Sequence, residues 1–145
     1  MANATAQKFG HPSTVIAESA CWWVQLRPSQ PTLGALVLIC KEPVRAFGEL
    51  SPEAFSDLKS VAQNIERTLK AFVGYEKINY LMLMMVDPDV HFHVLPRYPG
   101  AREQAGVRVV DAGWPGAPAL SEAVALDEAE IAELTGALRA IWAAA

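Results

Sequence analysis

The chain has 145 residues, of which 52% are apolar and 19% charged, and its formal net charge is −4. This length and composition are typical of one folded domain and exclude a disordered chain. The charge excludes a strongly basic surface, so nucleic acid is not an expected partner.

No apolar stretch has the length of a membrane-spanning helix, and the polar residues 1–10 lack the apolar core of a signal peptide. We therefore expect no membrane partner and a cytoplasmic location. Cys21 and Cys40 lie within apolar runs and form no Cys-x-x-Cys pair. Both are expected to be buried, reduced thiols.

Taken in chain order, residues 1–12 are expected to form a flexible lead-in. Runs rich in Val, Ile, Leu and Trp then predict three strands, at 14–17, 22–26 and 33–40. The segment 27–32 contains two prolines. Because proline cannot donate to a strand ladder, this segment is predicted to be a connecting loop.

The clearest element is a helix that begins after Ser51. Serine is a favourable N-cap, Pro52 suits the first helical position, and Gly74 supplies the stop. Between these ends, apolar residues recur at spacings of three and four, which indicates one buried stripe on a helix lying against a sheet. The stripe consists of Phe55, Leu58, Ala62, Ile65, Leu69 and Phe72.

Two further strands are predicted at 76–86 and 89–95, and the glycine- and proline-rich segment 97–118 is expected to be irregular. Asp127 and Glu130 form a capping-box-like start to a final helix. The order of elements predicts an α+β fold, with an antiparallel sheet of about five strands, one long helix packed on it and a C-terminal helix.

The chemically active side chains are concentrated around the strand predicted at 89–95. Side chains alternate between the two faces of a strand, so one face here is apolar and the other is polar. The polar face carries Asp87, Asp89, His91, His93 and Arg97. A neutral imidazole is a competent nucleophile, and a second imidazole two residues away can donate a hydrogen bond to the same phosphate. We expect this face to open onto a cleft or solvent.

The run His-Phe-His-Val-Leu-Pro-Arg at 91–97, with the residues upstream from Asn79, resembles the histidine triad (HIT) family, whose signature is His-φ-His-φ-His-φ-φ with φ apolar. It is most similar to a bacterial branch described as diadenosine polyphosphate hydrolases. The resemblance covers Ser13 to Arg97 and the stretch Asp-Ala-Gly-Trp-Pro that begins at Asp111.

The resemblance implies a HIT-like fold, with a nucleotide-binding domain over residues 13–110 and a C-terminal extension over 111–145 that carries a helix and packs on the same domain. It also implies a homodimer whose two sheets join edge to edge, a nucleotide substrate and no resident cofactor.

The resemblance further implies a nucleotidyl hydrolase or transferase. In the family, the central histidine attacks the α-phosphate and forms a covalent nucleotidyl-histidine, and the matching residue here is His91. His93 matches the third histidine and would contact the phosphate. The residues that match the family's nucleotide pocket, or stand beside it, are Gln25, Gln30, Thr32, Asn79 and Arg97.

Asp89 stands at the first triad position, where the family pattern has histidine. If the substitution is tolerated, the chain is an enzyme acting on a dinucleoside polyphosphate or a related nucleotide. If the carboxylate repels the phosphate and favours a protonated His91, the chain is a nucleotide-binding module with weak or no catalysis, unless Arg97 neutralises that charge. A third hypothesis is a metal-dependent enzyme, with a divalent ion held by Asp89, His91 and His93.

Overall fold

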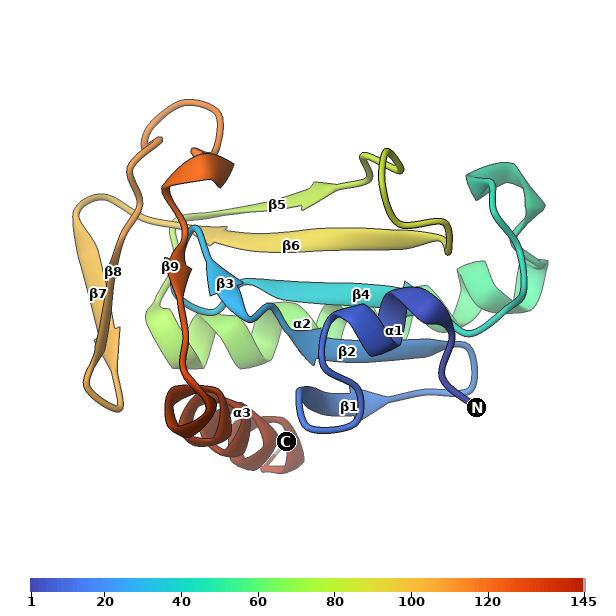
Figure 1. Ribbon diagram of the computed structural model, residues 1–145, viewed down its shortest axis with the longest axis horizontal. Coiled ribbons are helices and arrows are strands. Elements are labelled where there is room, and N and C mark those ends of the chain that lie inside the picture. The colour runs from blue at the N-terminus through green and yellow to red at the C-terminus, as the bar shows by residue number, and fades with distance from the viewer. Residues whose placement is uncertain (145) are drawn as a thin grey trace.

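The computed structural model describes residues 1–144 as an α+β fold built on a five-stranded sheet (Figure 1). The strands of this sheet are β1 (Val15–Glu18), β2 (Trp22–Leu26), β4 (Leu36–Cys40), β5 (Lys77–Leu81) and β6 (His91–Arg97). Their spatial order is β1-β2-β4-β6-β5, and every neighbouring pair is antiparallel. The predicted α+β fold is therefore confirmed, and β1 and β5 are the edge strands.

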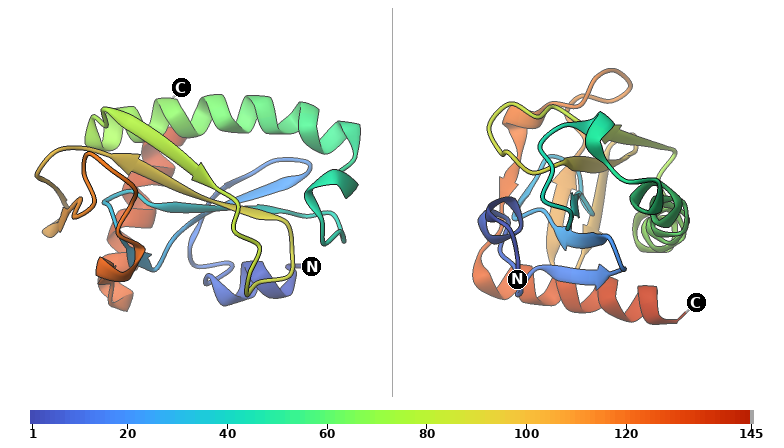
Figure 2. Two further views of the ribbon diagram at one scale, coloured as in Figure 1. Left: turned by 90° about the horizontal axis from the view of Figure 1, so that it is seen from above. Right: turned by 90° about the vertical axis from the view of Figure 1, so that its right-hand side faces the viewer.

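Helices cover both faces of the sheet, as Figure 2 shows. The long helix α2 (Pro52–Val73) lies on one face, the short helix α1 (Ala4–Lys8) lies on the other, and α3 (Glu128–Ala143) contacts α2 and β1. Alternate residues of β2 accordingly enter two different clusters: Trp22 packs in the main core, and Trp23 packs under α1. Because both faces are buried, β2 and β4 consist of apolar residues except for Gln25.

Both predicted ends of α2 are confirmed. The hydroxyl of Ser51 accepts a hydrogen bond from the Ala54 N–H, and Gly74 adopts a left-handed conformation with φ of 57°. The apolar stripe differs from the prediction in its first turns, because Ala54 and Val61 are buried whereas Phe55 is 41% exposed. The helix is therefore rotated slightly from the orientation that its aromatic residue suggested.

The segment predicted to be irregular contains a β-hairpin, formed by β7 (Ala101–Gln104) and β8 (Val107–Val110). Its two-residue turn places Ala105 at φ 51° and Gly106 at φ 79°. Such turns normally carry Asn or Asp at the first of these positions, so an alanine there leaves no recognisable sequence signal.

The two ends of the chain pack on the sheet domain. Residues 1–12, expected to be a flexible lead-in, contain α1, whose N-cap is Asn3 and whose Thr5 is buried. In the C-terminal region, β9 (Val124–Ala125) pairs with β3 (Ser29–Gln30), and α3 begins with the predicted capping box. Two one-turn 3-10 helices, Phe47–Glu49 and Leu120–Glu122, complete the elements.

Cys21 and Cys40 are both buried and free, as expected. Over residues 1–144, none of the helices combines the length and the apolar character that crossing a bilayer requires.

Candidate active site

The two histidines singled out in the sequence lie together at the start of β6. In the sheet register, His91 stands opposite Ile39, and His93 stands opposite Val37, which in turn faces Gln25 on β2. The centroids of the two imidazole rings are 5.3 Å apart, and the rings meet edge to face. Both side chains thus occupy the sheet face that α1 covers.

The protonation pattern of His91 follows from one contact. Its Nδ1 lies 2.7 Å from the backbone carbonyl oxygen of Asp89, and the residue is 2% exposed. A carbonyl oxygen can only accept a hydrogen bond, so Nδ1 carries the proton. In the neutral ring, Nε2 then keeps its lone pair and is the nitrogen available for attack.

His93 is held in its neutral form. Burial, together with the positive charge of Arg27, lowers the pKa of His93 to about 4. Its Nδ1 is buried and has no hydrogen-bond partner among the described residues. A neutral imidazole retains one N–H, which can donate to a phosphoryl oxygen.

The N-terminal segment forms one wall of this site. The ring centroid of Phe9 lies 6.5 Å from that of His91 and 5.8 Å from that of His93. Gln25 ties the segment to the sheet, because its Nε2 donates to the carbonyls of Ala6 and Phe9. The segment thus contributes an aromatic ring to the histidine site.

The carboxylate of Asp89 makes no hydrogen bond to either histidine. Its Oδ2 accepts from the N–H of Thr5 at 3.1 Å and from the Thr5 hydroxyl at 2.8 Å. The backbone N–H of Asp89 donates to the same hydroxyl oxygen at 3.2 Å. With 5% of the residue exposed, these contacts with Thr5 occupy the carboxylate inside the fold.

Arg97 does not neutralise Asp89, because it forms a buried ion pair with Asp111. Nε of Arg97 lies 2.7 Å from Oδ2 of Asp111, Nη2 lies 3.0 Å from Oδ1, and the two side chains are 4% and 1% exposed. Nη1 of Arg97 also donates to Oδ1 of Asn79. Two of the predicted nucleotide-binding side chains therefore bond to each other at the end of β6 away from His91.

The other predicted pocket residues are buried near the loop after β2. Gln30 bonds within that loop, donating to the carbonyls of Arg27 and Ala35 and accepting from the N–H of Gly34. The Thr32 hydroxyl and Oε1 of Gln25 have no hydrogen-bond partner within residues 1–144. A nucleotide-binding role for these residues stays a prediction.

Sequence reasoning missed Arg27, which it had assigned to the connecting loop. The Arg27 N–H still bonds to the Ala35 carbonyl, so the ladder between β2 and β4 continues for one more step, and Arg27 falls on the same face as Gln25. Nε of Arg27 is buried without a partner among the residues described. Extending the predicted strand 22–26 by one residue would have placed Arg27 on the same face as Gln25.

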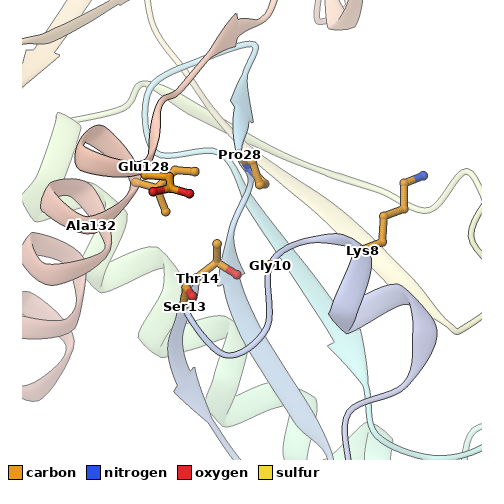
Figure 3. A pocket seen from close by; sticks show the side chains of 8 residues that line it. Lys8, Gly10, Ser13, Thr14, Pro28, Glu128 and Ala132 are labelled. Carbon is orange, nitrogen blue, oxygen red and sulfur yellow. The ribbon is translucent and has the colours of Figure 1, made fainter.

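A cavity of about 510 Å³ opens between the N-terminal segment and α3 (Figure 3). The residues that line it are Lys8, Gly10, Ser13, Thr14, Pro28, Glu128, Ile131 and Ala132. Neither His91 nor His93 is among them, but the hydroxyl of Thr14 accepts from Nε2 of Gln25. Gln25 is itself separated from His93 by Val37 on the intervening strand β4.

The described residues contain no group of three His, Cys, Asp or Glu side chains arranged to hold a metal ion. In the set proposed from the sequence, the side chain of Asp89 bonds to Thr5.

Comparison with known proteins identifies the family of this chain. A family model described as the HIT domain matches residues 10–100. The chain belongs to the HIT family. Membership supports a nucleotide-binding or hydrolase-type protein and confirms the resemblance found in the sequence, while the likeness to the diadenosine polyphosphate hydrolase branch stays a prediction. No curated protein matches this HIT chain.

Solved HIT structures share the fold at low sequence identity. A histidine triad protein from Bradyrhizobium japonicum is 20% identical, with a TM-score of 0.74, and the match covers 97% of this chain and 96% of that one. A histidine triad protein from Marinobacter aquaeolei VT8 is also 20% identical, with a TM-score of 0.73, and the match covers 99% of this chain and 96% of that one. A Zn-bound histidine triad family protein from Mycobacterium smegmatis is 20% identical, with a TM-score of 0.63, and the match covers 92% of this chain and 86% of that one.

Proposed function

We propose that this HIT protein is a nucleotidyl hydrolase or transferase that acts on the α-phosphate of a dinucleoside polyphosphate or a related nucleotide. The observation that carries the proposal is the 2.7 Å contact between Nδ1 of His91 and the Asp89 carbonyl. This contact selects the tautomer whose Nε2 can attack.

In the first step, the Nε2 lone pair of His91 forms a bond to the α-phosphorus, and the bond to the bridging oxygen breaks. The leaving phosphate departs with that electron pair. The imidazole of the nucleotidyl-histidine is positively charged, and the Asp89 carbonyl dipole stabilises this charge through the Nδ1 proton. In the second step, water or another acceptor attacks the phosphorus and releases His91.

The positive charge of Arg27 and the neutral imidazole of His93 support phosphate binding at this site. Burial and the Arg27 charge keep His93 neutral, as its lowered pKa indicates. We propose the 510 Å³ cavity as the place for the nucleoside, because its volume is typical of small-molecule pockets and because Thr14 joins it to Gln25.

The alternative is a nucleotide-binding module without catalysis, motivated by Asp89. The contacts of its carboxylate with Thr5 argue against this alternative, because they direct the charge away from His91. The metal-dependent alternative is motivated further by the zinc in the Mycobacterium smegmatis relative. In this chain it would require Asp89 to exchange both bonds from Thr5 for a metal ligand bond.

The test is incubation of the purified protein with dinucleoside polyphosphates and adenosine phosphoramidates, with and without chelator. We expect release of mononucleotide, abolished in His91→Ala and retained in His11→Ala, whose imidazole packs against Trp23 outside the site. Absence of turnover on every such substrate would contradict the proposal. Activity that is lost on chelation and restored by metal would favour the metal-dependent alternative.

We also propose a homodimer formed through the edge strand β5. The loop that follows β5 exposes Leu83, Met85 and Val86, which are 50%, 85% and 81% accessible. An unpaired strand edge next to exposed apolar side chains is a favourable place for two copies to join.

A further inference from the structure

The departure of this chain from the histidine triad pattern is accompanied by a compensating contact. Thr5 and Asp89 lie 84 residues apart in the sequence, and three hydrogen bonds join them. Both residues are buried, at 1% and 5% exposure. The Thr5 hydroxyl is central to this contact, because it donates to the Asp89 carboxylate and accepts from the Asp89 N–H.

These bonds hold the residue whose carbonyl orients the nucleophile. On the downstream side, the Val90 carbonyl accepts from the Cys40 N–H at 2.9 Å, which fixes that residue on β4. On the upstream side, Asp89 precedes β6, and among residues 1–144 its N–H bonds only to Thr5. The peptide that carries the Asp89 carbonyl is therefore anchored to the sheet at one end and to α1 at the other.

The carboxylate depends on Thr5 as well. Each ion pair in the described chain involves other groups, and the nearest in sequence joins Lys8 to Asp87. A buried carboxylate without a cation needs hydrogen-bond donors, and Thr5 supplies both of those present. Removing the Thr5 hydroxyl would leave Asp89 short of a donor and free to reorient.

We infer that Thr5 and Asp89 are a pair of positioning residues, which hold the Asp89 carbonyl against Nδ1 of His91 and so maintain Nε2 in its attacking form. The inference rests on the proposed function for its catalytic consequence, but the orientation of His91 is measurable without turnover. Because Thr5 lies in α1, this helix both covers the sheet and helps to position His91.

The test compares Thr5→Val, which removes the hydroxyl while keeping the side-chain volume, with Thr5→Ser, which keeps the hydroxyl. Thr68→Val is the matched control, because Thr68 is also 1% exposed and lies on α2, on the other side of the sheet. We expect kcat to fall between about 10-fold and 100-fold in Thr5→Val, with KM changed less than about threefold. Thr5→Ser should restore kcat, and Thr68→Val should leave it unchanged.

The second readout is the tautomer of His91, followed by ¹⁵N NMR of the imidazole in full-length protein. We expect the Nδ1–H form in the wild type and in Thr5→Ser, and a mixture of tautomers in Thr5→Val. If the wild type shows this form but no turnover, the proposed function fails while the positioning role stands. If the tautomer of Thr5→Val is unchanged, or if kcat follows thermal stability equally in Thr5→Val and Thr68→Val, the positioning role is overturned.

Discussion

At position 89 the bonding of the carboxylate matters more than its charge. Considered as a charge alone, an aspartate beside two histidines predicts repulsion of phosphate. In the fold, however, its Oδ2 faces Thr5, and only its backbone carbonyl contacts His91. The residue that departs from the family pattern therefore provides the acceptor that orients His91, a role that any residue can fill through its backbone once its position is secured.

The lowered pKa of His93 has a measurable effect on stability. Its pKa in the fold is about 4, below the ordinary 6.5, so between these values the unfolded chain takes up a proton that the folded chain resists. Stability should therefore fall as the pH decreases from about 6.5 towards 4, and should not change above 6.5 for this reason. The full shift corresponds to about 3 kcal/mol, which solvent screening of this partly exposed side chain reduces to roughly 2 kcal/mol.

Urea unfolding of the wild type and of His93→Gln at pH 7 and at pH 4.5 measures this contribution. The variant should lose less stability between the two pH values than the wild type, because the other titrating groups are common to both. Equal losses would show that His93 is not held neutral.

At the scale of elements, the buried pair Arg97–Asp111 joins β6 to the segment that follows the hairpin. Replacing Asp111 with Ala leaves a guanidinium buried without its charge partner, and it also removes the acceptor for the Tyr98 N–H. We expect Asp111→Ala to lower the free energy of unfolding by about 3 to 5 kcal/mol.

Denaturant titration of Asp111→Ala beside Glu18→Ala checks this value. Glu18 pairs with Lys41 at the surface, where its side chain is 59% exposed, and its loss should cost less than about 1 kcal/mol. Comparable losses in the two variants would contradict a structural role for the buried pair.

Among the helices and strands, the features that the sequence predicts are those that depend on neighbouring residues. Both ends of α2 and the start of α3 were predictable because Ser51, Gly74, Asp127 and Glu130 act on their immediate neighbours. The pairing of the histidines on one face followed from the period of a strand. By contrast, the strand predicted at 76–86 ends at Leu81, because apolar composition alone does not distinguish a strand from an apolar loop.

The contacts that complete the site lay beyond such local signals. Thr5 and Asp89 are brought together only by the packed sheet, and neither residue belongs to a periodic pattern that points to the other. Arg97 was predicted to bind nucleotide or to neutralise Asp89, because nothing local in the sequence indicated that it would pair with Asp111. Long-range polar pairs of this kind require the tertiary structure.

At the scale of the whole molecule, the proposed homodimer gives a direct prediction for the apolar loop after β5. Leu83→Glu would place a charge at the proposed interface, so we expect this variant to sediment as a monomer in analytical ultracentrifugation where the wild type sediments as a dimer. Val110→Glu is the matched control, since Val110 is 45% exposed on β8 and lies outside β5 and its loop. A wild type that is monomeric at all concentrations would rule out the homodimer.

The 84-residue separation between Thr5 and Asp89 also sets the order in which the molecule is assembled. During synthesis, Thr5 leaves the ribosome long before its partner exists. A helix of five residues has no stability of its own, so we expect α1 to form only with its tertiary contacts, among them the bonds between Thr5 and Asp89. The segment that is made earlier thus folds late, and a chain halted before that step has a sheet but lacks the wall that this segment adds to the histidine site.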